Sequence, residues 1–352
     1  MALMTVNVAD ARFFVASKRI THRSLRQISS NRSSSRSSIS SVSNPAFNNV
    51  SSSSVENSVR SHLLLLGQTT PMLAGVKFFS TSEPVQVTAI TVNIASAAPS
   101  VDSFLVYDAE DRLLGTATQQ STLTYRTTIA AGRLSLPRRQ DVSIYVRARL
   151  RSHESGGVSN ELIQVGSVEV SGNGEWSNEA YTNVSSDTFP LSRTARGSIV
   201  SIKNVGASEA PLTNGTAQML AELRFVSTRT DASAHVRVTQ LQFQIEQTGG
   251  VTVSNVSLKT NGIDTTSSCT VASTIVTCSA IPTDIGQIDD NKTMRIYGDV
   301  SVPNGALNPT LRLTLNDPGT VNSAGAITWT DTEGAFTWVD VEQPVVRGTM
   351  FR

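Results

Sequence analysis

Cys269 and Cys278 are the residues of this sequence whose spacing best suits a covalent bond. They are nine positions apart and flank Thr270–Thr277. If the chain turns back near Ser273 and Thr274, the two side chains face each other across adjacent strands, within reach of a disulfide. A zinc site would need further thiol or imidazole ligands, and none lies at a suitable spacing. The spacing therefore predicts a disulfide, and a disulfide indicates an oxidising, extracellular compartment.

Three tryptophans, Trp176, Trp329 and Trp338, could stack on a sugar ring. Trp176 and Trp329 fall opposite each other when the two halves of the chain are aligned, as described below. A position that recurs in both halves usually serves the shared fold. Packing in a core or at a sheet edge is therefore the favoured interpretation, with Trp338 the least settled, and a carbohydrate platform remains the alternative.

Two acidic clusters could supply oxygen ligands to Ca²⁺, which is the one cofactor that the sequence suggests. They are Asp108, Glu110 and Asp111 in the first half, and Asp289 and Asp290 in the second. Neither cluster has the alternating aspartates of a dedicated calcium loop. Solvated hairpin tips are the favoured interpretation, and calcium binding is the alternative.

Motifs of enzyme active sites are missing from the chain. It contains no nucleophile elbow, phosphate-binding loop, dinucleotide glycine fingerprint or His-Glu-x-x-His. The four histidines have no serine or cysteine partner at a catalytic spacing. We expect no enzymatic activity, no resident metal and no organic cofactor.

Length and composition favour strands over helices. The 352 residues are 39% hydrophobic, 16% charged and 5% aromatic, and their low charge disfavours a helical bundle or coiled coil. The length suggests two domains with additional sequence. No apolar run approaches the ~18 residues that a membrane span requires, so we expect no transmembrane segment.

The first sixty residues differ from the rest of the chain. They carry eight Lys or Arg against two acidic residues, and residues 21–60 include sixteen serines. Such a stretch predicts a disordered basic tail over 1–60, most simply a flexible leader. An organellar transit peptide and an RNA-binding capsid arm are the alternatives, and no secretory signal is visible. The body is weakly acidic, so nucleic acid could bind only through the tail.

The body repeats one strand pattern. Val85–Ile94 and Val236–Ile245 alternate with period two, and both shift phase by one residue at the same place, 151 positions apart. Such a shift predicts a β-bulge or a strand that changes sheets. Ser121–Leu150 aligns with Ser273–Val302, which places Ala117 and Arg126 opposite the two cysteines.

Short strands with frequent turn signals predict β-sandwiches. We expect an all-β chain of two tandem Ig-like or jelly-roll-type domains, over 61–197 and 198–352, with the second an internal repeat of the first. Units of this size can each bury a core of their own.

A resemblance follows from the order of these segments. The second unit contains Gly197-Ser-Ile-Val, Asn214-Gly-Thr216, Ala221-Glu-Leu-Arg-Phe225 and Val236-Arg-Val238-Thr-Gln-Leu241. It resembles repeats in large surface proteins, S-layer-like or adhesin-like, of small-genome candidate-phylum bacteria. The resemblance implies an exported, non-enzymatic module of an envelope or adhesive assembly and supplies no binding residues.

The leading hypothesis is therefore a structural or adhesive module of the cell surface, located outside the cell. Its partners would be neighbouring copies or other envelope proteins, and surface glycans are a further option. Rigid units and edge strands would make the contacts. The alternatives are a carbohydrate-binding module and a capsid-type protein whose basic arm binds RNA.

Overall fold

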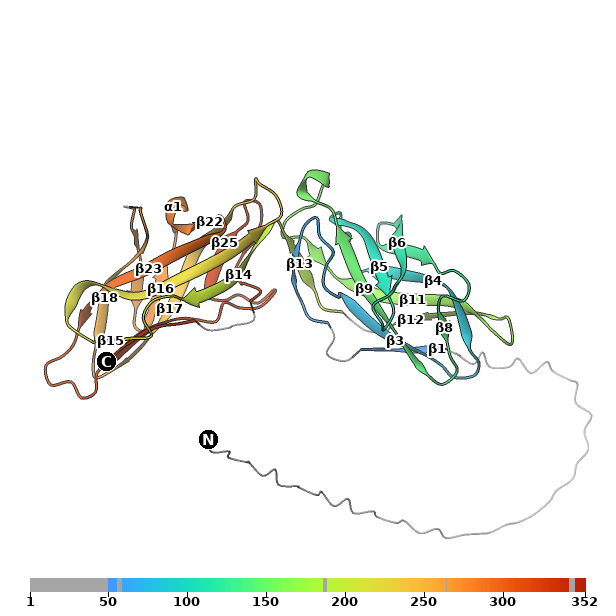
Figure 1. Ribbon diagram of the computed structural model, residues 1–352, viewed down its shortest axis with the longest axis horizontal. Coiled ribbons are helices and arrows are strands. Elements are labelled where there is room, and N and C mark those ends of the chain that lie inside the picture. Colours follow the sequence, from blue (N-terminus) through green and yellow to red (C-terminus); the bar gives the residue numbers. More distant parts are fainter. Residues whose placement is uncertain (1–49, 56–58, 186–188, 264, 342–345) are drawn as a thin grey trace, which may run out of the picture. The chain divides into compact units, whose positions relative to one another are not determined.

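Strands make up nearly all of the regular structure of this protein. The structure is a computed structural model that describes residues 50–55, 59–185, 189–263, 265–341 and 346–352. Its described helices are one 3-10 turn, η1 (His153–Ser155), and one turn of α-helix, α1 (Thr283–Gly286). The prediction of an all-β fold of β-sandwich type is confirmed (Figure 1).

The first core is enclosed by one ten-stranded sheet. Its strands are β1 (Val50–Ser54), β3 (Ala74–Ser80), β4 (Val85–Ile94), β5 (Val101–Tyr107), β6 (Leu113–Ser121), β7 (Thr124–Thr128), β8 (Ser135–Leu136), β9 (Asp141–Leu150), β11 (Val165–Gly174) and β12 (Ala180–Val184). The order is β1-β3-β9-β5-β6-β7-β4-β11-β12, with β8 on β4. Inward side chains such as Phe78, Ile90 and Phe104 are fully buried and form one cluster. At the two ends of this order, Asn183 donates to the Val50 carbonyl at 2.8 Å, which links β12 to β1.

The second core lies between two sheets. One contains β14 (Gly197–Asn204), β16 (Gly215–Arg229), β18 (Thr252–Thr260), β19 (Ser267–Ser268) and β23 (Asn291–Ser301). The other contains β15 (Glu209–Ala210), β17 (Val236–Thr248), β20 (Thr270–Ala272), β21 (Ile275–Cys278), β22 (Gln287–Ile288), β24 (Thr310–Leu315), β25 (Ile327–Thr330), β26 (Ala335–Phe336) and β27 (Val346–Phe351). Phe225, Phe243 and Trp329 are fully buried in this cluster.

A small fourth sheet connects the two regions along the chain. It consists of β2 (Leu63–Leu65), β10 (Leu162–Ile163) and β13 (Ser192–Ala195), with β2 parallel to β13. β13 leads through Arg196 directly into β14.

The predicted phase shift is confirmed as a bulge in both cores. On β4, Val87 and Ala89 pair with the consecutive residues Gly172 and Ser171, so Thr88 is the extra residue. On β17, Val238 and Gln240 likewise pair with consecutive residues of β25. Because side chains alternate along a strand, one extra residue turns the remaining apolar positions back toward the core.

Strand pairing follows the same order around both cores. β3-β9-β5-β6 in the first core corresponds to β16-β23-β18-β19 in the second. The described members of the first cluster end at Phe189, and those of the second begin at Ala195. The internal repeat and the boundaries 61–197 and 198–352 stay predictions that this order supports.

The predicted tail extends too far into the structured part of the chain. Residues 50–54 form β1, which pairs in register with β3 from Val50–Ser80 to Ser54–Val76. An edge strand needs hydrogen bonds on one side only, and here one valine is buried. The high serine content of residues 50–54 therefore predicted disorder where the chain forms an edge strand. Residues 1–49 of the predicted disordered tail lie outside the described residues.

Candidate functional site

The predicted disulfide is confirmed. Cys269 and Cys278 are joined with an S–S distance of 2.05 Å, and the hairpin turns at Ser273 and Thr274. Cys269 lies where the chain passes from β19, in one sheet, to β20, in the other. The bond therefore anchors this crossing to Cys278 at the end of β21.

The cysteine alignment is wrong by one residue in the first core. Ile90 of β4 pairs with Thr127 of β7. Leu241 of β17, which corresponds to Ile90 in the repeated strand pattern, pairs with Cys278. Thr127, which is buried, is therefore the counterpart of Cys278, in place of Arg126.

We predict that the double substitution Cys269→Ala and Cys278→Ala lowers the free energy of unfolding by about 2.5 kcal/mol. The closed loop is short, and the chain-entropy model assigns about this value to a loop of some ten residues. Thermal unfolding of the full chain should shift down by roughly 5–10 °C. Reducing agent should destabilise the wild type and leave the double variant unchanged. An equal effect on both proteins would contradict the prediction.

Two of the three tryptophans are buried in the second core. Trp329 is 0% exposed and Trp338 is 4% exposed. The ring of Phe336 stacks on Trp329 at 4.4 Å and meets Trp338 edge-on at 5.6 Å. Trp329 also donates its indole N–H to the Trp338 carbonyl at 2.7 Å. The core-packing interpretation is confirmed for both residues, and their use as a sugar platform is excluded because no face is free.

Trp176 lies in a different environment from Trp329. It sits in the turn between β11 and β12 and is 67% exposed. Val87 pairs with Gly172, whereas its counterpart Val238 pairs with Trp329. The predicted equivalence of the two tryptophans is therefore wrong by four residues. Of the two favoured placements, a core or a sheet edge, the core is wrong for Trp176.

The turn that carries Trp176 is held by one carboxylate. Glu83 accepts hydrogen bonds from the backbone N–H groups of Trp176 and Ser177, at 2.8 and 3.0 Å, from the Ser177 hydroxyl at 2.6 Å and from the Tyr181 hydroxyl at 2.9 Å. The hydrogen bond from the Ser177 side chain is the largest cause that lowers the pKa of Glu83, to about 2. The guanidinium of Arg138 lies 5.8 Å from the centre of the Trp176 ring. Sequence patterns missed Glu83, because its partners are more than ninety positions away.

We predict that this turn responds to acid only below the ordinary range of a glutamate. A lowered native pKa means that the charged carboxylate stabilises the fold fully above pH 4.5, and that this stabilisation is lost as the pH falls toward 2. In an NMR titration, the amide signals of Trp176 and Ser177 should shift with a midpoint near 2. The Glu83→Gln variant should show no such transition. A midpoint near 4.5 in the wild type would contradict the prediction.

The acidic clusters form hydrogen-bonded turns. Asp108 accepts from the backbone N–H groups of Glu110 and Arg112 at 3.0 and 2.9 Å and pairs with the Arg112 guanidinium at 2.7 Å. Asp111 pairs with Arg147 at 2.9 Å.

In the second cluster, Asp289 accepts from Gln287 at 3.0 Å, and the Asp290 carbonyl accepts from a backbone N–H of β16. Within the described residues, no group of three or more His, Cys, Asp or Glu is placed to bind a metal. The favoured interpretation as a solvated tip is wrong for Asp108, which is buried. Calcium binding at either cluster stays an untested alternative.

A buried carboxylate connects residues that flank both cores. Asp331, between β25 and β26, is 0% exposed. Its Oδ2 accepts from the Ser159 hydroxyl and from the backbone N–H of Arg196 at 2.6 Å. Its Oδ1 accepts from the backbone N–H of Gly334 at 2.8 Å. The turn after β25 is thereby bonded to the segment before β10 and to the residue between β13 and β14. We call Ser159, Arg196 and Asp331 the junction.

Arg196 adds charge pairs at the junction. Its side chain is 4% exposed and pairs with Asp231 at 2.7 Å and with Glu333 at 3.6 Å. The hydrogen bond from Arg196 holds the pKa of Asp231 well below its usual range. His153 places its Nδ1 3.4 Å from Glu333. Local sequence patterns missed this cluster, because Ser159 and Arg196 lie 172 and 135 positions from Asp331.

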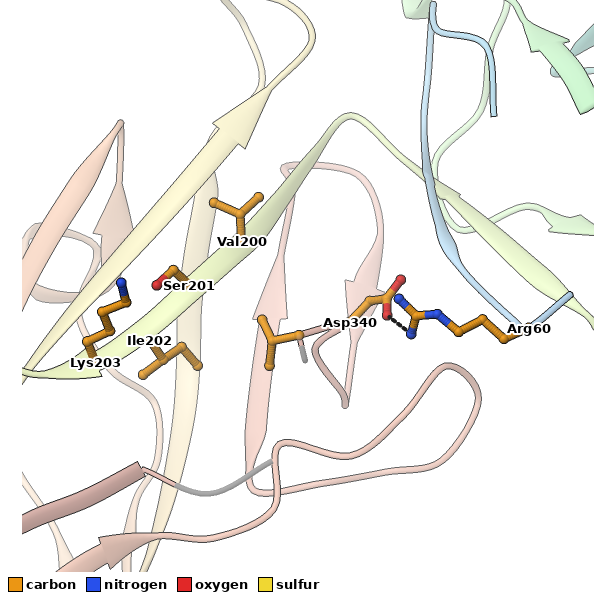
Figure 2. A pocket seen from close by; sticks show the side chains of 7 residues that line it. Arg60, Val200, Ser201, Ile202, Lys203 and Asp340 are labelled. Carbon is orange, nitrogen blue, oxygen red and sulfur yellow. Dashed lines mark hydrogen bonds and ion pairs between the residues drawn. The ribbon is translucent and has the colours of Figure 1, made fainter. Parts of the chain in front are cut away.

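A groove of about 390 Å³ runs beside β14. It is lined by Arg60, Val200, Ser201, Ile202, Lys203, Asp340 and Val341. Figure 2 shows Lys203 at one end of these residues and the Arg60–Asp340 pair at the other. Asp340 accepts from Arg60 Nη1 and from the Leu63 backbone N–H, both at 3.0 Å. Burial raises the pKa of this carboxyl, but the hydrogen bonds from His62 and Leu63 and the Arg60 charge outweigh burial and lower it.

No helix among the described residues has the length and apolar character of a membrane span.

Comparisons with known proteins add little to this geometry. No family model and no curated protein match the chain. The C-terminal domain of the AgI/II polypeptide BspA of Streptococcus agalactiae is 8% identical, with 84% of this chain and 99% of that chain covered and a TM-score of 0.24. The CupB6 tip adhesin of Pseudomonas aeruginosa is 9% identical, with coverages of 86% and 99% and a TM-score of 0.25. The T6 backbone pilin of Streptococcus pyogenes is 9% identical, with coverages of 78% and 64% and a TM-score of 0.22. These neighbours are surface proteins, but TM-scores this low carry no argument for this chain, and none bears on a candidate-phylum origin.

Proposed function

We propose that this chain is a non-enzymatic structural module of an extracellular surface assembly, in which two β-sandwich cores act as one stiff unit. The junction carries this proposal. A buried carboxylate whose oxygens are hydrogen-bonded is costly to pull away from its donors, because both the donors and the charge would lose their partners. Bending the chain at Arg196 would break these bonds, so the junction resists bending.

The disulfide supports the extracellular part of the proposal. Cys269 and Cys278 are the only cysteines of the chain, and they are bonded to each other. Disulfides of this structural kind persist in oxidising compartments.

Localisation of the native protein tests this function. Immunogold labelling of intact cells should place the protein at the cell surface, and non-reducing mass spectrometry of that material should find both cysteines oxidised. A cytosolic pool that contains free thiols would overturn the proposal.

Carbohydrate binding at Trp176 is the second candidate, and the exposed ring favours it. Indole rings that are held in place and open to solvent stack on sugars. A glycan array should then show binding that Trp176→Ala abolishes. Leu307→Ala is the matched control, since Leu307 is 87% exposed and far from Trp176 in the chain. Equal binding by both variants, or no binding by the wild type, would exclude this candidate.

A further inference from the structure

Two strands of the second core become irregular beside the same aspartate. Asp299 lies on β23, which is the central strand of its sheet and pairs with β16 and β18. Next to Asp299, the register of β16 shifts between Gly215 and Gln218, and that of β18 shifts between Ser254 and Ser257. Irregularities of this kind redirect side chains and are common beside binding sites.

The carboxylate of Asp299 holds both irregular segments. Its Oδ1 accepts from the backbone N–H of Ala217 at 2.8 Å, and its Oδ2 accepts from the side-chain amide of Asn255 at 2.7 Å. Ala217 and Asn255 both have a φ of +49°, which residues other than glycine rarely adopt. Backbone strain of this kind gathers at ligand sites. The hydrogen bonds from Asn255 and Ala217 also lower the pKa of Asp299, so the carboxylate is charged at neutral pH and fixed in direction.

A pocket of about 470 Å³ opens beside this carboxylate. Its volume lies in the range of small-molecule sites. Asp299 is the only charged side chain among the described residues that line the pocket. Four uncharged polar side chains also line it, and these are exposed and make no side-chain hydrogen bond within the described part of the chain: Thr216, Ser254, Ser301 and Asn304.

These groups define the chemistry of a ligand. Each carboxylate oxygen of Asp299 has a second lone pair, so the ligand should donate hydrogen bonds. The Asn304 amide can donate two N–H groups, so the ligand should also accept. A cation cannot accept, and the charge of Asp299 repels an anion. A neutral ligand with several hydroxyl groups does both, and Val302 offers apolar surface to the C–H groups of a sugar ring.

We propose that this pocket binds a neutral saccharide, with the Asp299 carboxylate accepting hydrogen bonds from two hydroxyl groups of one sugar ring. Ser301 and Asn304 bond to the neighbouring hydroxyl groups. Asn255 is a positioning residue, because its amide holds the carboxylate from the side of β18. This inference does not depend on the proposed function, and the site is separate from Trp176, which follows β11 in the sheet of the first core.

Nuclear magnetic resonance of the full chain tests the site. The methyl glycosides of glucose, galactose, mannose and N-acetylglucosamine serve as probes, and Ca²⁺ is tested separately. At millimolar concentration, at least one sugar should shift the amide signals of Asp299 and Val300 until the site saturates. The Trp176→Ala variant should bind this sugar like the wild type. The absence of a shift with all four sugars, or shifts at these amides with Ca²⁺ alone, would overturn the proposal.

Substitutions in the pocket measure what its polar side chains contribute. The double variant Ser301→Ala and Asn304→Ala should weaken sugar binding about tenfold, because each lost hydrogen bond weakens it several-fold. Ser121→Ala with Asn173→Ala is the matched control, since these residues are also exposed, make no side-chain hydrogen bond within the described part of the chain and lie on β6 and β11. Equal affinity of the two double variants would overturn the proposal.

Two glycine substitutions test the positioning role of Asn255. Asn255→Gly removes the amide donor and tolerates the φ of +49°, so it should weaken sugar binding about threefold. Ala217→Gly tolerates the same φ and keeps its backbone N–H, so it should bind like the wild type. Thermal unfolding should be similar for both variants. Equal sugar affinity of the two would contradict the role of a fixed carboxylate. None of these experiments bears on cellular location, so their failure is distinguishable from failure of the proposed function.

Discussion

Replacing Asp331 by alanine is expected to lower the free energy of unfolding by about 3 kcal/mol, because the buried donors of Ser159, Arg196 and Gly334 lose their acceptor at once. Thermal unfolding of the full chain should shift down by roughly 6–12 °C. Hydrogen exchange should accelerate at Arg196 and Gly334 before the remainder of either core opens.

The isosteric change Asp331→Asn separates acceptor loss from loss of volume. Both carboxylate oxygens accept from backbone N–H groups, so the amide nitrogen must face a donor on one side. This variant should therefore lose at least about 1.5 kcal/mol. Asp317→Ala is the matched control, since Asp317 is exposed and accepts one backbone N–H, from Gly319 at 2.8 Å. If Asp331→Ala were no more destabilised than Asp317→Ala, the junction would not couple the segments it touches.

Features that depend on local spacing could be predicted from the sequence. The bulge in β4 and β17 follows from an apolar phase shift within ten residues, and the disulfide from a nine-residue hairpin. In both cases the residues that interact lie close in the chain, so alternation and turn position determine the geometry.

Features that depend on distant partners could not be predicted. Ser159 and Asp331 are 172 positions apart, and Glu83 and Ser177 are 94 positions apart. No periodicity selects one carboxylate among many for such a contact. β1 was missed for a related reason, because an edge strand takes its order from the backbone of β3 and needs no apolar composition of its own.

The tryptophans show the same limit of a one-dimensional alignment. The match of Trp176 to Trp329 rested on residue type alone. The strand pairs show instead that Gly172 is the residue of the first core that corresponds to Trp329. One ring is therefore solvent-exposed and the other fully buried. Their substitution should have very different consequences.

Trp329→Ala is expected to lower the free energy of unfolding by about 4 kcal/mol, more than Asp331→Ala does. It removes a fully buried indole that stacks on Phe336, and the surrounding strands cannot close the resulting cavity. The change also leaves the buried Trp338 carbonyl without its donor. Chemical denaturation of the full chain, followed by near-ultraviolet circular dichroism, should detect an early transition of the second core.

Two further variants assign this loss to its causes. Trp329→Phe keeps most of the ring and removes the N–H donor, so it should cost about 1–2 kcal/mol. Trp176→Ala removes an exposed ring and should cost at most about 0.5 kcal/mol. If Trp329→Ala were as mild as Trp176→Ala, the aromatic cluster would not hold the second core together. The ordering Trp329→Ala, then Trp329→Phe, then Trp176→Ala follows from burial and from the single hydrogen bond to Trp338, and it requires no ligand at either ring.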